Sequence, residues 1–533
     1  MFARRDYLLI AVYALRILLC LAPEHGYIQP DEFFQFTEPI AERLLGVKAY
    51  IPWEFSEAHP IRSVFLPLLI AGSSFKAIAA TNLASSWLLL VIPRLVITLL
   101  SFVSDYCLYQ ICNLLDKHAA RNAQIVFATS YLVLTYCTHT FTNSIELVLL
   151  SLLLLFTAKC VKSGKTQHSS AIATITCIGL FNRATFICFA VVPIIFWILS
   201  DGKKLAVLKV LRILITLLPA FTTTAFTFVF VDTLYYSRIS LTDLNEYQEL
   251  LKRIVITPLN FIMYNTKHSN LEKHGLHPFY QHSVVNVPLA FTVLGILAYK
   301  ETIGVLWCTV MRKKTKEFSS EIRRLMLLTF IISLSLLSFI PHQEPRFLIP
   351  CLLPLCFLFG KKVYESKIHF FLWIVSNCVL VLIYGFVHQA GVTKALFEVR
   401  QQFDNHAGQR MDVIFSRMYL PPQHLLHISQ KNENLHIHDL SIQEFPEAVY
   451  NKLKQLNETI TENIYVVIPS CLTIRLETVF HNLNIHNFKL EKQIFPHFTF
   501  EDLQASFELL MLKQRSPFAS AFSMNIFNVK MRD

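Results

Sequence analysis

Directly after the first apolar segment of this chain, residues 26–35 read Gly26-Tyr27-Ile28-Gln29-Pro30-Asp31-Glu32-Phe33-Phe34-Gln35. The apolar segment, 7–22, has the composition of a membrane span, and two adjacent carboxylates follow it among aromatic side chains. Ionisable groups at a membrane boundary are costly unless they serve a function, so Asp31 and Glu32 indicate acid–base chemistry on a substrate that the bilayer presents. Considered alone, these ten residues also fit a solvated acidic loop.

The composition of the chain, 533 residues long, indicates a polytopic membrane protein. Hydrophobic residues make up 53% of it and charged residues only 16%, whereas a soluble globular domain has about 25% charged residues. The net charge is +11, but the basic residues gather in short loops between apolar segments, as in cytosolic loops. These residues are Lys159, Lys162, Lys165, Lys203, Lys204, Lys209, Arg212, Arg312, Lys313, Lys314, Lys316, Arg323, Arg324, Lys361, Lys362 and Lys367. The positive charge therefore reflects membrane orientation rather than nucleic-acid binding.

The apolar segments predict about eleven crossings, although several are shorter than the roughly 20 residues that a spanning helix needs. The candidate spans are 7–22, 83–113, 123–140, 145–159, 170–180, 184–199, 213–231, 284–310, 325–340, 347–360 and 369–388. We expect 61–80 to be a re-entrant or interfacial helix, because a crossing there would move the basic loops off the cytosolic side. Arg4 and Arg5 then hold the N-terminus in the cytosol, and the C-terminus lies on the opposite side.

This topology places the unusual polar residues on one non-cytosolic side, which in a eukaryotic cell is the lumen of the endoplasmic reticulum. Residues 23–60 carry seven acids against two bases, the reverse of the cytosolic loops. We expect 1–390 to form a transmembrane catalytic domain with a first lumenal loop at about 23–82. Residues 391–533 form a polar, lumenal tail, where Asn457-Glu458-Thr459 is an N-glycosylation sequon.

The cysteines and histidines predict neither a disulfide framework nor a metal site. Of twelve cysteines, all but Cys471 lie in or beside apolar segments, and no CxxC or zinc-like spacing occurs. His268, His274, His277 and His282 are spaced by 6, 3 and 5 residues, which fits no helical ligand pair well. We expect no cofactor and no metal.

Further polar motifs lie on the same predicted lumenal side. The longest places three ionisable groups in five residues, His342-Gln343-Glu344-Pro345-Arg346-Phe347. It either serves a function or is a hairpin cap in which Glu344 and Arg346 neutralise each other. Arg183, in Phe181-Asn182-Arg183, interrupts an apolar stretch and requires a buried anion or a re-entrant turn.

Aromatic and amide side chains gather in 232–278, at Tyr235, Tyr236 and Asn270 among others. Such side chains are typical of a sugar-binding surface, and also of the aromatic belt at a membrane interface. The sequence leaves both interpretations open.

Taken together, these motifs resemble the dolichol-phosphate-mannose-dependent mannosyltransferases of glycosyltransferase family 22. The resemblance covers 1–390 and rests on Gln29–Gln35, Pro52-Trp53-Glu54-Phe55, Arg62-Ser63, Phe181–Arg183 and His342–Phe347. It implies an all-α polytopic membrane protein with the GT-C fold and an active site facing the endoplasmic-reticulum lumen. The family usually has histidine where this chain has Gln29, so an imidazole role has no counterpart at that position.

Within the family, three features favour the subgroup that adds the fourth mannose to a GPI-anchor precursor. They are Phe33-Phe34, Pro52–Phe55 and the stretch 270–277. The implied donor is dolichol-phosphate-mannose, and the implied acceptor is the third mannose of the lipid-linked precursor. The expected linkage of the fourth mannose is α-1,2. Because the donor is β-linked and the product α-linked, a single inverting displacement is expected.

The resemblance also implies roles for individual residues. Asp31 is expected to be the general base, and Glu32 to orient the acceptor or to tune Asp31. Arg346, then His342 and Arg183, are expected to bind the donor phosphate. The expected substrate-binding residues are Gln35, Trp53, Glu54, Arg62, Tyr235, Tyr236, Asn270, His274, His277 and Glu344.

Three alternatives stay open at this point. One is a sibling of the same family that adds the third GPI mannose or a mannose of the N-glycan precursor. Another is a flippase or transporter of polyprenyl lipids, which would carry charged residues along the interiors of its spans. The few interior charges here are Arg94 and Arg183, which argues against this alternative. The third is a non-catalytic subunit, which would tolerate loss of both Asp31 and Glu32. The sequence identifies no protein partner.

Overall fold

The computed structural model describes residues 4–202, 207–238, 253–272, 275–311, 320–406, 408–458, 463–512 and 518–530. Lys203, Lys204, His274 and the basic residues of 312–316 lie outside them. The chain forms two compact units. The helical unit comprises Met1–Leu21, Pro52–Ile70 and Arg94–Cys378, and the sheet unit comprises Ala22–Ile51, Ala71–Pro93 and Val379–Asp533. The structure thus groups two early stretches with the C-terminal residues, whereas the sequence predicted a single boundary near residue 390.

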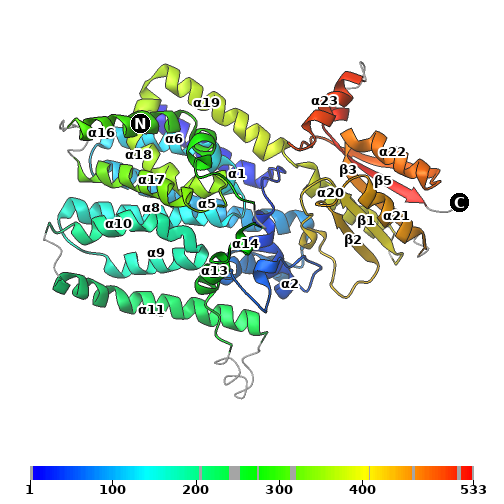
Figure 1. Ribbon diagram of the computed structural model, residues 1–533, viewed down its shortest axis with the longest axis horizontal. Coiled ribbons are helices and arrows are strands. Elements are labelled where there is room, and N and C mark those ends of the chain that lie inside the picture. The colour runs from blue at the N-terminus through cyan, green and yellow to red at the C-terminus, as the bar shows by residue number, and fades with distance from the viewer. Residues whose placement is uncertain are drawn as a thin grey trace. The chain divides into compact units, whose positions relative to one another are not determined.

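Long apolar helices build the helical unit. They include α1 (Arg4–Leu21), α5 (Ser86–Asn113), α6 (Lys117–Ala128), α8 (Thr142–Ser163), α9 (Ser169–Asn182), α10 (Ile187–Leu199), α11 (Val207–Ser237), α16 (Val293–Val310), α17 (Glu321–Ser338), α18 (Leu352–Glu365) and α19 (Lys367–Val381). Figure 1 shows α8, α9, α10 and α11 side by side, and these helices contact one another in the order α10, α8, α9, α11. α17 packs against both α10 and α18. The first residues after α9 therefore lie in a turn between two packed helices.

Five helices among the described residues are long and apolar enough to cross a membrane. They are Ser86–Asn113, Thr142–Ser163, Ile213–Ser237, Pro345–Glu365 and Lys367–Val387. Three shorter apolar helices are Phe65–Thr81, Ser169–Asn182 and Ala184–Leu199. The membrane character expected from composition is supported, and the count of about eleven crossings stays a prediction.

A charged pair lies inside the helical unit. Arg16 of α1 donates through Nη1 to Asp105 Oδ2 at 2.7 Å and through Nη2 to Asp105 Oδ1 at 3.2 Å. Both side chains are almost fully buried. Buried charges are tolerated when they are paired in this bidentate way, so this arginine is accounted for by packing.

The C-terminal part of the chain is not all-α, so that expectation is wrong for residues 411–530. Five strands form one sheet in the order β2-β1-β3-β5-β4. They are β1 (Met411–Ser416), β2 (Leu435–Leu440), β3 (Asn463–Pro469), β4 (Asn487–Ile494) and β5 (Met524–Lys530). β1 pairs in parallel with β2 and β3, whereas β5 pairs antiparallel with β3 and β4.

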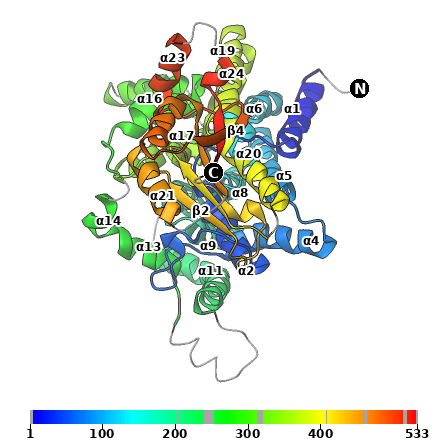
Figure 2. The ribbon, with the colours of Figure 1, turned by 90° about the vertical axis from the view of Figure 1, so that its right-hand side faces the viewer.

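Helices cover this sheet. α21 (Glu447–Glu458) and α22 (Thr473–Asn482) share one apolar cluster with it, which includes Val449, Leu453, Leu476 and Phe480. α20 (Gly391–Asn405) contacts β4 and β5, and Figure 2 shows α20 and α21 on either side of the strands. The parallel strands β1 and β3 are buried along their whole length, because parallel strands covered by helices lose contact with solvent.

Candidate functional site

The Gly26–Gln35 motif lies in the sheet unit, against the backbone that follows α19. The Gly26 N–H donates to Gly385 O at 2.7 Å. A Cβ atom on Gly26 would lie 2.0 Å from Tyr384 O, so only glycine permits this approach. The contact fixes the start of the motif.

The two carboxylates of the motif lie in different surroundings. Asp31 and Glu32 are helical, and the π-helical turn η1 (Phe33–Thr37) follows them. Asp31 is partly exposed, whereas Glu32 is fully buried, because successive side chains on a helix point about 100° apart. π-Helical turns are frequent at functional sites. Of the two acids, only Asp31 has a partly exposed side chain.

Neighbouring groups of the motif in the sheet unit are buried. The pKa of the Tyr27 phenol is raised well above its usual value by burial and by the carboxylates of Glu32, Glu38 and Asp31, so the phenol is a neutral donor. It donates to Leu420 O at 3.0 Å. Glu38 accepts the His424 N–H at 3.0 Å and is fully buried. Gln35, predicted to bind substrate, is 5% exposed.

The His342–Phe347 motif lies in the helical unit and holds a compact charge network. Glu344 Oε2 accepts from Arg346 Nε at 2.7 Å, and Glu344 Oε1 accepts from Arg346 Nη2 at 2.8 Å. His342 Nε2 lies 2.8 Å from Glu344 Oε1. Burial would raise the pKa of Glu344, but Arg346, with His342, outweighs it and holds that pKa well below its usual range. The hydrogen bond to Glu344 in turn raises the pKa of His342.

The ring of Phe347 is the centre of a wider group. The guanidinium of Arg183 lies over it at 4.9 Å and that of Arg346 at 5.5 Å. The His342 ring lies 5.7 Å from it and the His282 ring 6.5 Å, centroid to centroid. We call these five residues the Phe347 cluster. Two buried guanidinium groups thus share one ring, and each also lies beside a glutamate, Arg183 beside Glu146 and Arg346 beside Glu344.

His282 adds an oriented donor to the Phe347 cluster. Asn286 Nδ2 donates to His282 Nδ1 at 3.0 Å, so the ring hydrogen is on Nε2. Burial lowers the pKa of His282 to about 4, which keeps the ring neutral. Nε2 is buried and has no hydrogen-bond partner among the described residues. It can therefore donate to a ligand.

Arg183 is accommodated by a turn and by a carboxylate that the sequence did not point out. It follows α9, and its Nε lies 3.6 Å from Glu146 Oε2 of α8. Its Nη1 donates to Thr142 Oγ1 at 3.3 Å. Glu146 is 1% exposed and also accepts from Asn143 Nδ2 at 2.8 Å. A single glutamate in an apolar helix was a signal that sequence reasoning missed.

The segment 52–65 forms a second group in the helical unit. Glu54 Oε1 accepts from Arg62 Nε at 2.9 Å. Trp53 is 45% exposed, and its ring lies 4.7 Å from the ring of Tyr264. Glu54 thus holds Arg62, and an aromatic pair lies beside them.

Asp232 and Tyr236 of α11 anchor this segment. Asp232 accepts from Ser63 Oγ at 3.0 Å, from Val64 N at 2.9 Å and from Thr257 Oγ1 at 3.0 Å. Tyr236 donates to the backbone oxygen of Arg62 at 2.6 Å. Tyr236, predicted to bind substrate, is 4% exposed, and this hydrogen bond holds the backbone of Arg62. Tyr235 packs edge-on against it.

A family model described as the Alg9-like mannosyltransferase family matches residues 7–426. This chain belongs to that family. It is therefore a glycosyltransferase, and family membership supports the GT-C architecture that the motifs implied.

Curated relatives of this mannosyltransferase share the assignment. GPI alpha-1,2-mannosyltransferase 4 of Homo sapiens is 32% identical over 93% of this chain and 89% of its own length. GPI mannosyltransferase 4 of Drosophila melanogaster is 28% identical over 92% of this chain and 85% of its own length. The protein of the same name from Saccharomyces cerevisiae is 31% identical over 79% and 76%.

Solved structures are more distant from this mannosyltransferase. ArnT from Cupriavidus metallidurans, bound to undecaprenyl phosphate, aligns over 99% of this chain and 98% of its own, with a TM-score of 0.48 and 11% identity. The Archaeoglobus fulgidus oligosaccharyltransferase aligns over 88% and 69%, with a TM-score of 0.44 and 11% identity. Both TM-scores lie below 0.5, so neither structure establishes more about this mannosyltransferase.

The remaining predicted residues of this mannosyltransferase fall into three situations. His277 lies beside the Phe347 cluster, because its ring lies 5.7 Å from that of His342. Asn270 makes a local contact, donating to Tyr264 O at 3.0 Å. Asn457 is exposed near the end of α21, while Thr459 of the sequon lies outside the described residues. No group of three or more potential metal ligands occurs among the described residues.

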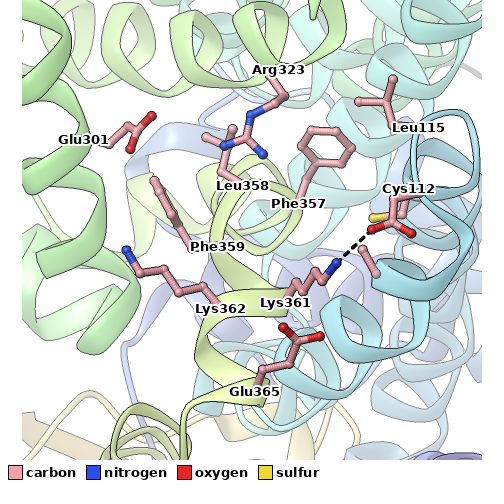
Figure 3. A pocket seen from close by; sticks show the side chains of 12 residues that line it. Cys112, Leu115, Glu301, Arg323, Phe357, Leu358, Phe359, Lys361, Lys362 and Glu365 are labelled. Carbon is pink, nitrogen blue, oxygen red and sulfur yellow. Dashed lines mark hydrogen bonds and ion pairs between the residues drawn. The ribbon is translucent and has the colours of Figure 1, made fainter. Parts of the chain in front are cut away.

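A cavity of about 440 Å³ lies at the far end of α18 from the Phe347 cluster. Figure 3 shows Arg323, Lys361 and Lys362 around it, together with Glu301 and Glu365. Asp116 is the third acid that lines the cavity. Lys361 Nζ forms an ion pair with Asp116 Oδ2 at 3.0 Å. Cations and acids are thus equal in number, so this cavity has no net charge that would select an anion.

Proposed function

We propose that this mannosyltransferase transfers mannose from dolichol-phosphate-mannose to the third mannose of a GPI-anchor precursor, through an α-1,2 linkage. Family membership supports the reaction class. The names of the relatives, at 28–33% identity, support the GPI precursor and the fourth mannose. The observation that carries the proposal is the Phe347 cluster, where two guanidinium groups and two imidazoles surround one ring.

The donor phosphate binds at the Phe347 cluster. Arg346 binds Glu344 through Nε and Nη2, so its third nitrogen, Nη1, points away from Glu344. The raised pKa of His342 favours its charged form. Arg183 supplies a second guanidinium, and His282 a neutral donor. These side chains stabilise a phosphate whose charge increases in the transition state, without a metal.

Asp31 is the general base. It removes the proton of the acceptor hydroxyl while the hydroxyl oxygen attacks the anomeric carbon of mannose. The bond from that carbon to the phosphate oxygen breaks, and its electron pair goes to the phosphate. The products are the extended precursor, dolichyl phosphate and a protonated Asp31. Glu32 is buried and positions the helix that carries Asp31.

The acceptor binds beside segment 52–65. Trp53 presents an exposed aromatic face, and the Glu54–Arg62 pair offers both an acceptor and donors for hydroxyl groups. We place the reaction on the lumenal side of the endoplasmic-reticulum membrane, where GPI precursors carrying mannose are exposed. A glycan on Asn457 would support that orientation.

A transfer assay tests this proposal. Purified wild-type and Asp31→Asn proteins receive labelled dolichol-phosphate-mannose and GPI precursors carrying two, three or four mannoses. We expect transfer only onto the three-mannose precursor, and only by the wild type. Transfer onto the two-mannose precursor would move this chain to a sibling reaction. Normal transfer by a folded Asp31→Asn protein would remove Asp31 as the base.

A further inference from the structure

Two buried oxygen atoms near the start of α8 have no hydrogen-bond partner among the described residues. They are Asn143 Oδ1 and Glu146 Oε1. Asn143 is 0% exposed and Glu146 1%. Buried acceptors are nearly always satisfied in folded proteins, so two together indicate a missing donor.

The orientation of both groups is fixed. Asn143 Nδ2 donates to Glu146 Oε2 at 2.8 Å, so the amide oxygen of Asn143 must point away from that carboxylate oxygen. The two residues are three apart on α8 and therefore lie on one face. When Glu146 is ionised, each residue leaves one oxygen that accepts, and a ligand with two donors would satisfy both.

Charge indicates which donors these are. Glu146 already lies 3.6 Å from the guanidinium of Arg183 and interacts electrostatically with Arg62 and Arg346. A further cation is therefore not needed to neutralise it. Neutral hydroxyl groups fit better, and neighbouring hydroxyls of a pyranose ring supply two donors side by side.

The position of the two oxygens identifies the sugar. Arg183 bridges them to the Phe347 cluster, because it lies beside Glu146 and over the Phe347 ring. The mannose of the donor is bonded directly to its phosphate, so its hydroxyls lie next to the side chains that hold the phosphate. We propose that Asn143 and Glu146 bind hydroxyl groups of the donor mannose, an inference that rests on the proposed donor.

A purely structural role for Glu146 makes a different prediction. If Glu146 only held Arg183 in place, its loss would weaken use of every donor by one factor, whatever hydroxyls the sugar carries. If Glu146 accepts from one hydroxyl, its loss and the loss of that hydroxyl remove the same interaction, and the two effects do not add.

The experiment compares donors that lack single hydroxyls. Dolichyl-phosphate mannose and its 2-, 3-, 4- and 6-deoxy forms are given to full-length wild-type, Glu146→Gln and Asn143→Ala proteins. We expect one deoxy donor to lower wild-type kcat/KM by about 10- to 100-fold, since a hydrogen bond to a charged group contributes about that much. In Glu146→Gln, kcat/KM for the same deoxy donor should be lower than that for dolichyl-phosphate mannose by less than about threefold. Asn143→Ala should show this pattern for the same or the adjacent hydroxyl.

Asp105→Asn is the matched control, because Asp105 is also a buried carboxylate paired with an arginine in the helical unit. It should lower the melting temperature and keep the wild-type deoxy pattern. Equal deoxy penalties in wild type, Glu146→Gln and Asn143→Ala would overturn the inference while leaving the donor assignment intact. If Glu146→Gln does not fold, Asn143→Ala decides alone. Failure of the wild type to use dolichyl-phosphate mannose would instead overturn the proposed function, and the inference with it.

Discussion

Replacing Phe347 by leucine should weaken use of the donor without abolishing the fold. Phe347 provides the aromatic face on which Arg183 and Arg346 both lie, at 4.9 and 5.5 Å. Leucine keeps an apolar side chain there and removes the π face. Tyrosine is the matched control, because it keeps both the ring and its face.

The structure sets the size of the effect. A guanidinium within about 6 Å of a ring gains roughly 0.5–1 kcal/mol at exposed sites and about 2 kcal/mol when desolvated. Both arginines are buried, at 8% and 4% exposed, so about 1 kcal/mol for each is a moderate figure. The sum of about 2 kcal/mol corresponds to a fall of roughly 30-fold in kcat/KM.

The assay is transfer at varied donor concentration and saturating acceptor, with melting temperatures of the detergent-solubilised proteins measured in parallel. Phe347→Leu should lower kcat/KM for the donor by about 30-fold, and Phe347→Tyr by less than about threefold. The acceptor KM should not change in either variant. The parallel melting curves separate lost donor binding from lost packing.

Two results would refute this reasoning. One is equal donor kinetics for the wild type and Phe347→Leu, which would mean that the ring does not orient the guanidinium groups. The other is an equal loss in Phe347→Leu and Phe347→Tyr. That outcome would assign the effect to the shape of the site rather than to the aromatic face.

Three further variants test other parts of the structure. Asp31→Asn should lower transfer by more than about 10²-fold at an unchanged melting temperature, whereas Glu32→Gln, at a fully buried position, should lower the melting temperature; the reverse pattern would exchange their roles. Glu344→Gln should shift the alkaline limb of the pH profile of donor kcat/KM to lower pH. The hydrogen bond to Glu344 raises the pKa of His342, so in the wild type the imidazole keeps its positive charge until the pH rises through that raised pKa. An unchanged limb would remove His342 from donor binding. Asp232→Asn should destabilise the protein by about 1–3 kcal/mol, since the Val64 N–H and two hydroxyls donate to this carboxylate; an unchanged melting temperature would show that the segment is held by other contacts.

Apolar length and composition predicted the long helices, because a membrane span needs little more than both. The prediction was wrong for 123–140, which is not one helix: α6 ends at Ala128, and α7 (Tyr131–Leu134) is a separate turn. There the Tyr131 N–H donates to Asn377 Oδ1 of α19 at 2.7 Å. A partner 246 residues away satisfies the interrupted backbone, and no local pattern can show it.

The sheet could not be predicted for a similar reason. The central strands β1 and β3 are buried on both faces and lack the alternation that marks a half-exposed strand. In the sheet, β1 lies between β2 and β3. This order depends on the crossover connections between parallel strands rather than on local residues.

For the candidate site, the sequence predicted the residues of the proposed function but not their surroundings. Asp31 and Glu32 are equivalent in the sequence, and only the helical rotation between them decides which one is buried. The pairing of Glu344 with Arg346 was expected as one alternative, and it is present. Phe347 belongs to a motif visible in the sequence, yet its position under two arginines depends on the fold.

The pairing of Glu344 with Arg346 is compatible with the proposed role of Arg346 in binding the donor phosphate. Arg62, Arg183 and Arg346 each lie beside a glutamate, at 2.8, 3.6 and 2.7 Å. Buried arginines without partners would destabilise the protein whenever the donor is absent. Each carboxylate contacts one edge of its guanidinium and thereby fixes the direction of the remaining N–H groups. Such a site would stabilise a ground-state phosphodiester, which has one negative charge, only modestly. It would stabilise the departing monoester more strongly as the second negative charge develops. Groups that are oriented beforehand and only partly neutralised therefore favour the transition state over the bound donor.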